Sequence, residues 1–319
     1  HVINQMIPYL KRHWQCPTAP YLRGKEPFIS INRSIETIQS ILELNAQYTF
    51  IFTSSAAESM SHIYQSVYLD DVVKSGKTHF LTTPIEDSSI LMGIKRWEGV
   101  GIRKKEIPLD AEGRVTKENV EKSLTPRVAI FSMAAACGLT GVVHPFEEIA
   151  ALCKEKNVLF HLDISDVLGK LYLPLENVDF VTFDGDRIHG PKGSGALFSL
   201  KKIGALIADG TCQHGMRGGT LNTAALIGLS TACEEAKENF DHVVMETVRL
   251  KTKLEEGIVN GVRGAKILFG TLDRLPHVTA LSFPGVHFEL LAFHLKEQGV
   301  YGSFGGGRLQ NLEPLLCSM

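Results

Sequence analysis

The sequence predicts an α/β protein with a doubly wound, mainly parallel sheet and a second, smaller α+β domain. Strand-like and helix-like segments alternate over the first two thirds of the chain, which is typical of βαβ units. The strand-like segments are apolar on both faces, as expected for a sheet covered by helices on both sides. Near Thr220 this alternation ends and a long helical pattern begins, which indicates the change to the smaller domain.

The individual elements follow in chain order. Short apolar runs predict strands at 78–84, 128–133, 158–164, 179–184 and 196–200. Helical periodicity predicts helices at 58–70, 88–97 and 145–156. In the last third we expect one long helix or two joined helices over 222–256, a strand at 278–283, a helix at 288–298 and a glycine-rich loop at 302–308. The predicted domains are 14–222 for the larger, and 223–319 together with 1–13 for the smaller.

Composition excludes several classes of function. The 319 residues carry 33 basic and 35 acidic side chains, and this balance argues against a nucleic-acid surface or an anionic membrane surface. No apolar run approaches the roughly 20 residues of a membrane span. The six cysteines include no C-x-x-C pair, which favours reduced thiols over a disulfide framework or a zinc site. We therefore expect a cytoplasmic protein.

Four segments should meet at one edge of the sheet, because ligands bind beyond the carboxyl ends of parallel strands. They are 53–58, a strand-to-helix turn; 161–163, at the end of a strand; 184–193; and 216–222, a glycine-rich turn. The first segment contains Ser55, Ala56 and Ala57, whose backbone N–H groups would favour an anion at the start of the helix. A simple helix cap explains that segment equally well.

The amino-acid sequences of these segments resemble the motifs of a known family. FTSSAAES is similar to the family motif F-T-S-G-A-T-E-S, and HLDISDVLGK is similar to H-V-D-A-A-Q-x-x-G-K. MRGGTLN is similar to L-R-S-G-T-L-N, and GPKGSGALF is nearly identical to the family's sequence at that position. RLPHVTALSFPGV and NLEP follow in the expected order. Together they resemble the cysteine desulfurases, the NifS-like branch of the class V aminotransferases. The resemblance implies a fold-type I transferase dependent on pyridoxal phosphate (PLP), a homodimer, and a protein partner in sulfur or iron–sulfur metabolism.

The chain departs from this family mainly where the family's chemistry is carried. Arg187 stands at the position of the lysine that forms a Schiff base with PLP, and Gly307 stands at the position of the persulfide cysteine. A guanidinium stays protonated and cannot attack an aldehyde. The remaining departures are Asp87 for the ring-stacking histidine, Cys137 and Gly138 for an asparagine pair, Asp166 for a glutamine, and Ala57, Asp184 and Asp186 for residues of the phosphate cup.

Two functional positions keep the family residue. Asp163 corresponds to the aspartate that pairs with the pyridine nitrogen, and Thr220 to the threonine that reaches the phosphate of the neighbouring subunit. Lys192 lies near the missing amine and could replace it only if the turn shifted, so a structural role is favoured. His161 and His189 are interpreted as supporting or core histidines rather than ligands. Because the lost positions are chemical and the kept ones mostly architectural, we expect PLP binding to be lost or weak.

The substitutions predict an acidic pocket. Crowded carboxylates must be neutralised, since like charges at short range repel. The first possibility is that Arg187 and Lys192 pair with the carboxylates and neutralise them. The second is an open pocket that is filled by water and holds no ligand. A third is a cation, either a small organic one or Mg²⁺ or Ca²⁺ on oxygen ligands. The acidic residues are Asp87, Asp163, Asp166, Asp184 and Asp186, of which Asp87, Asp163, Asp184 and Asp186 are the metal candidates.

Three functions remain open from the sequence. The first is a desulfurase-related protein that has lost PLP chemistry and acts as a non-catalytic or scaffold homologue. The second is a divergent enzyme that uses the acidic pocket with a divalent metal. The third is a residual PLP-dependent transferase acting on cysteine or another amino acid.

Overall fold

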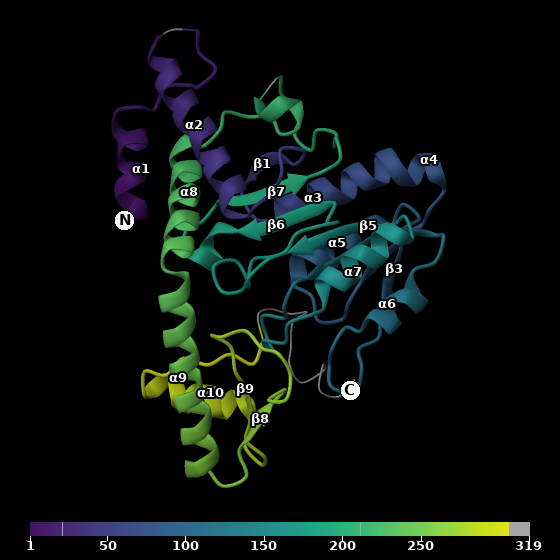
Figure 1. Ribbon diagram of the computed structural model, residues 1–319, viewed down its shortest axis with the longest axis vertical. Helices are drawn as coiled ribbons and strands as arrows, with labels where there is room; N and C mark the ends of the chain where they lie inside the picture. Colours follow the sequence, from purple (N-terminus) through teal and green to yellow (C-terminus); the bar gives the residue numbers. More distant parts are fainter. Residues whose placement is uncertain (21, 211, 306–319) are drawn as a thin grey trace.

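The computed structural model describes residues 1–20, 22–210 and 212–305 (Figure 1). Its centre is a seven-stranded sheet in the order β1-β7-β6-β5-β4-β2-β3. The strands are β1 (Thr49–Thr53), β2 (His79–Thr82), β3 (Arg103–Glu106), β4 (Val128–Ala134), β5 (Leu159–Asp163), β6 (Phe180–Asp184) and β7 (Gly195–Ser199). β7 is antiparallel to both of its neighbours, and the β2–β3, β2–β4, β4–β5 and β5–β6 pairs are parallel. The predicted mainly parallel α/β sheet is therefore confirmed.

Helices cover both faces of the sheet. The helices that precede α8 in the chain are α1 (Val2–Lys11), α2 (Leu22–Ile41), α3 (Ala56–Val67), α4 (Val73–Ser75), α5 (Ser88–Glu98), α6 (Lys117–Ser123) and α7 (Phe146–Glu155). A π-helical turn, Tyr68–Val72, prolongs α3, so the helix predicted over 58–70 is confirmed with a change of pitch at its end.

Two apolar layers form the core, one on each face of the sheet. Phe80, Ile130 and Phe180 face α3 and α5, where they pack in one cluster with Met60 and Ile63. The alternate strand positions face the other way and pack with side chains of α2, α7 and α8. This alternation follows from the two-residue period of a strand. It also fixes which side chains point toward α3 at the strand ends.

The long helix predicted over 222–256 is two joined helices, α8 (Thr223–Glu238) and α9 (Phe240–Gly261). Asn239 ends the first and precedes the second. α8 packs against α1 and α2 beside the large sheet, whereas α9 runs on to the small sheet (Figure 1). None of the helices within the described residues has the length and apolar character needed to cross a membrane.

The C-terminal part holds the two-stranded antiparallel sheet of β8 (Lys266–Leu268) and β9 (Ala280–Ser282), with α10 (Phe288–Glu297). A bidentate ion pair joins it to α9, since the Arg274 guanidinium donates to both carboxylate oxygens of Glu255 at 2.8 and 3.2 Å. The strand predicted at 278–283 and the helix predicted at 288–298 are confirmed with slightly shorter bounds. The division into domains at residue 222 remains a prediction.

Candidate functional site

The four predicted segments converge at the carboxyl-end edge of the sheet. Asp163 is the last residue of β5 and Asp184 the last of β6, and the N-terminus of α3 follows β1 at the same edge. The backbone N–H of Ala56 donates to Asp184 Oδ1, which joins the start of α3 to the end of β6 across 128 residues of sequence. The topology thus brings these positions together as the sequence predicts.

Asp163 is held by a set of defined donors. Thr182 Oγ1 donates to Asp163 Oδ2 at 2.7 Å, and the Ser165 N–H donates to Oδ1 at 2.9 Å. Enclosure raises the pKa of Asp163 to about 6, while these hydrogen bonds act in the opposite direction. The carboxyl group is therefore fixed in direction and titrates close to neutral pH.

Asp184 occupies the anion position at the start of α3. Its carboxylate accepts the Ala56 N–H, and its own backbone N–H donates to Ser165 Oγ at 3.0 Å. A helix N-terminus favours negative charge. Burial nevertheless raises the pKa of Asp184 to about 6, and the nearby Asp186 and Asp87 charges act in the same direction. Ser55 caps the same helix by accepting the Glu58 N–H, while Ala57 is exposed on the first turn.

Arg187 lies in the short 3₁₀ turn 185–188 and forms an ion pair with Asp166, with 3.3 Å between Nη1 and Oδ1. Burial lowers the pKa of Arg187, but Asp166 and then Asp87, Asp186 and Asp163 more than offset this and hold it above its usual range. Gly138 makes the arrangement possible, because a Cβ there would lie 2.5 Å from Asp166 Oδ2. The carboxylate of Asp166 uses the space that a side chain at 138 would need.

Asp87 and Cys137 are engaged locally. The Asp87 carboxylate caps α5 by accepting the Ser89 N–H at 2.9 Å. Cys137 is buried, and burial raises the pKa of its thiol. Beside them lies Glu86, which the sequence analysis did not single out. It is fully buried, accepts from Thr83 Oγ1 at 2.6 Å and from the Ala134 N–H at 2.8 Å, and burial raises its pKa to about 8.

The remaining predicted residues lie around this centre. Thr220 and Lys192 are exposed, as are Asp186 and His189. His189 has a φ of 63°, the left-handed conformation that ends the 3₁₀ turn. His161 is buried on β5, where burial lowers the pKa of the ring to about 3, which agrees with the prediction of a core histidine. Gly307 lies outside the described residues.

The metal interpretation finds no support in this geometry. Across 1–20, 22–210 and 212–305 no three His, Cys, Asp or Glu side chains are grouped to hold a metal ion. Three of the four candidate carboxylates have hydrogen-bond partners within the protein: Asp87 caps α5, Asp184 binds the start of α3, and Asp163 is held by Thr182 and Ser165. The metal site at Asp87, Asp163, Asp184 and Asp186 therefore remains a prediction.

Two supporting interactions were missed by sequence reasoning. The Arg217 guanidinium donates to Glu58 Oε1 at 2.8 Å and so ties the glycine-rich turn to α3. The Lys170 ammonium donates to the Arg187 carbonyl oxygen at 3.2 Å, and burial lowers its pKa. The sequence shows a basic residue in each of the two motifs, but it does not show which group that residue contacts.

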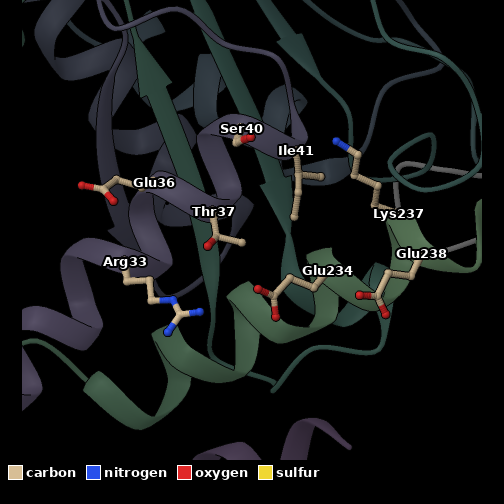
Figure 2. Close-up of a pocket in the computed structure, with 8 residues that line it drawn as sticks. All are labelled: Arg33, Glu36, Thr37, Ser40, Ile41, Glu234, Lys237 and Glu238. Atoms are coloured by element: carbon tan, nitrogen blue, oxygen red, sulfur yellow. The ribbon is translucent and has the colours of Figure 1, made fainter.

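Two hollows lie away from this site. One of about 360 Å³ is lined by residues of both α2 and α8 with mixed charges, including Arg33, Glu36 and Glu234 (Figure 2). The other, of about 590 Å³, includes Leu159 and Asp179 and therefore lies at the amino ends of β5 and β6, the opposite edge of the sheet. Neither hollow is lined by a predicted site residue.

Comparison with known proteins identifies the lineage. A family model described as aminotransferase class-V matches residues 1–308. The chain belongs to the aminotransferase class-V family. Within this class V family it is 30% identical over 311 residues to the cysteine desulfurase IscS of Clostridium botulinum strain Hall, which covers 95% of the chain and 77% of that relative. It is 28% identical over 319 residues to a cysteine desulfurase of Bradyrhizobium diazoefficiens, with 98% and 80% covered.

Solved structures place this class V chain in the same group. A NifS-like protein superposes with a TM-score of 0.90 at 29% identity, covering 99% of the chain and 85% of that structure. A NifS-like protein from Rickettsia africae superposes with a TM-score of 0.86 at 22% identity, covering 100% and 85%, and shows the fold alone. The chain is thus a homologue of cysteine desulfurases with the fold-type I architecture.

Proposed function

We propose that this cysteine desulfurase homologue has lost PLP-dependent chemistry and acts as a non-catalytic binding or scaffold protein. The observation that carries the proposal is the Arg187–Asp166 ion pair at the position of the family's lysine. Schiff-base formation needs an amine that can lose its proton. The surrounding carboxylates raise the pKa of Arg187 further, so its guanidinium is the wrong chemical group in a setting that keeps it charged.

The phosphate position supports the same conclusion. In the family, the start of the helix corresponding to α3 receives the PLP phosphate, whereas here the carboxylate of Asp184 accepts the Ala56 N–H. At about 6 Å and an effective dielectric constant near 20, each pair of like unit charges repels by roughly 3 kcal/mol. Asp87 offers no flat face for a pyridine ring and is bound to α5. The residues present therefore do not fit PLP.

A PLP titration of the purified protein tests this proposal. We expect no visible aldimine band and no lysine adduct after borohydride reduction, with the Clostridium botulinum IscS as the positive control. Peptide mass spectrometry of the reduced sample would identify any amine that reacts, with Lys192 and Lys170 as the amines to examine. A reducible band on either lysine, or sulfide released from cysteine at the rate of the control, would refute the loss of PLP chemistry.

Paired variants separate the two obstacles to the cofactor. Arg187→Lys restores the amine but keeps the Asp184 carboxylate. The double variant, Arg187→Lys with Asp184→Ser, has the amine and lacks the carboxylate, so both obstacles to PLP are removed. We expect the double variant to bind PLP at least about tenfold more tightly than Arg187→Lys alone, because the carboxylate repels the phosphate. Equal affinities would contradict the role assigned to Asp184.

The proposed scaffold role includes a homodimer and a protein partner in sulfur or iron–sulfur metabolism, as the resemblance to cysteine desulfurases implies. Light scattering after gel filtration tests the dimer, and a monomer mass at micromolar concentration would overturn it. The cytoplasmic location, and the absence of a nucleic-acid partner, remain expectations from composition.

A further inference from the structure

A row of polar side chains crosses the sheet beneath the candidate site. The row runs over four consecutive strands of the sheet, β2, β4, β5 and β6. Its members are all fully buried: Thr82, Ser132, His161 and Thr182. Ser132 and His161 are register partners. Two residues earlier, three of these strands carry Phe80, Ile130 and Phe180, which pack with α3, so the polar row faces α3 as well.

Four polar atoms in this layer lack a hydrogen-bond partner among the protein atoms of the described ranges. They are Tyr64 Oη on α3, Thr82 Oγ1, Ser132 Oγ and His161 Nδ1. The Tyr64 hydroxyl lies beside Ser132. Ser132 has His161 as its register partner on one side, and Thr82 follows on the neighbouring strand on the other, so the four groups lie close together. Unpaired buried polar atoms are rare in native proteins, and buried water commonly satisfies them with about three hydrogen bonds. Four of them together therefore indicate a hydrated site.

The hydrogen bonds next to this site have a defined direction. Thr182 Oγ1 uses its one proton to donate to Asp163 Oδ2 at 2.7 Å, so the same oxygen must accept from His161 Nε2 at 2.8 Å. The His161 ring is buried and neutral, so a proton on Nε2 leaves Nδ1 as an acceptor. Nδ1 of His161 therefore requires a hydrogen-bond donor, and a water molecule can supply it.

We propose that Tyr64, Thr82, Ser132 and His161 enclose an internal water site, and that water, His161 and Thr182 form one directed hydrogen-bond relay ending at Asp163. In this relay His161 and Thr182 are positioning residues, because they act on the site through the Asp163 carboxylate. The other titratable and charged groups that face Asp163 are Glu86, Asp166, Arg187 and Tyr64. The relay belongs to the protein by itself and does not depend on whether a cofactor binds.

A crystal structure of the purified protein and ¹⁵N NMR of its histidines test the relay. We expect an ordered water oxygen at about 3 Å from His161 Nδ1 and from at least one of the three hydroxyl groups. We also expect His161 to be the Nε2–H tautomer at neutral pH. An Nδ1–H tautomer, or hydroxyl groups that pair directly with the ring without a water between them, would overturn the proposal.

A variant tests the effect on Asp163. Thr182→Val keeps the shape of the side chain and removes the hydroxyl, so the pKa of Asp163, followed by ¹³C NMR of its carboxyl carbon, should rise by about one to two units. Thr182→Ser should restore the original titration. Thr231→Val is the matched control, because the Thr231 hydroxyl is also buried but donates to the Ile227 carbonyl on α8. An unchanged Asp163 titration in Thr182→Val would refute the relay, and the wild-type tautomer decides the question if that variant does not fold.

Discussion

Glu86 should make this protein less stable as pH rises from about 4.5 through about 8, and Glu86→Gln should remove that contribution. The side chain is fully buried between Thr83 Oγ1 and the Ala134 N–H, and burial raises its pKa to about 8 from an ordinary 4.5. A carboxyl group whose pKa is raised in the folded state is bound to a proton that the unfolded chain has lost. Its contribution is complete below pH 4.5 and is lost as pH rises through 8.

The magnitude follows from proton binding. Between pH 7 and pH 9 the unfolded chain holds no proton on Glu86, whereas the folded state holds about half a proton on average over this window. The free energy of unfolding should therefore fall by about 1.4 kcal/mol over these two pH units because of this single group. Glutamine has nearly the same shape as the protonated acid and does not titrate, so the variant should not show this part of the fall.

Urea unfolding at pH 7 and pH 9 measures the free energy of unfolding of the wild type and of Glu86→Gln. The effect of Glu86 is the loss of stability between the two pH values in the wild type, minus the same loss in the variant. Glu118→Gln is the control, since it makes the same substitution at an exposed glutamate in the first turn of α6. If the wild type and Glu86→Gln lose the same stability between the two pH values, the assignment of a buried, protonated Glu86 is wrong.

Three further predictions concern single contacts. Gly138→Ala places a methyl carbon 2.5 Å from Asp166 Oδ2 and should lower the free energy of unfolding by about 1–3 kcal/mol; a urea midpoint equal to that of the wild type would show that Asp166 moves freely. Ser55→Ala removes the cap of α3 and should cost about 1 kcal/mol, which Ser55→Asn should largely restore in the same unfolding assay. Glu255→Gln leaves the nearly buried Arg274 guanidinium without its charge partner and should cost about 3–5 kcal/mol in chemical unfolding, and a loss below about 1 kcal/mol would contradict this.

The sequence predicts the part of the fold that rests on apolar periodicity. Five strands of the large sheet agree with the structure to within two residues, because buried strands are continuous apolar runs. β3 was not predicted, since Arg103–Glu106 is a polar edge strand whose charges protect an open sheet edge. The strand-to-helix turn at 53–58 implies a strand before it, which is β1, but its bounds were not predicted. The helices α1, α2 and α6 lie outside the segments that the periodicity singled out.

The sequence also predicts one part of the candidate site and not the other. The order of the motifs predicts which segments meet, because parallel strands end at one edge of the sheet. The partner of each charge is not predictable from that order. Asp184 and Ala56 are 128 residues apart, and the space beside Gly138 is visible only once Asp166 has been placed. Burial also decides that Glu86 is protonated, and a linear sequence does not show burial.

The departures from the family occur in physically coupled groups. Gly138 leaves the space that Asp166 occupies, and Asp166 pairs with Arg187. Asp184, in turn, satisfies the start of α3. An uncompensated buried charge costs several kcal/mol, so a pocket that lost its ligand through unrelated substitutions would be left with unpaired groups. Here Asp166 pairs with Arg187, Asp184 and Asp87 accept backbone N–H groups, and Asp186 is exposed to solvent. These charges are therefore balanced within the protein itself, without a bound ligand.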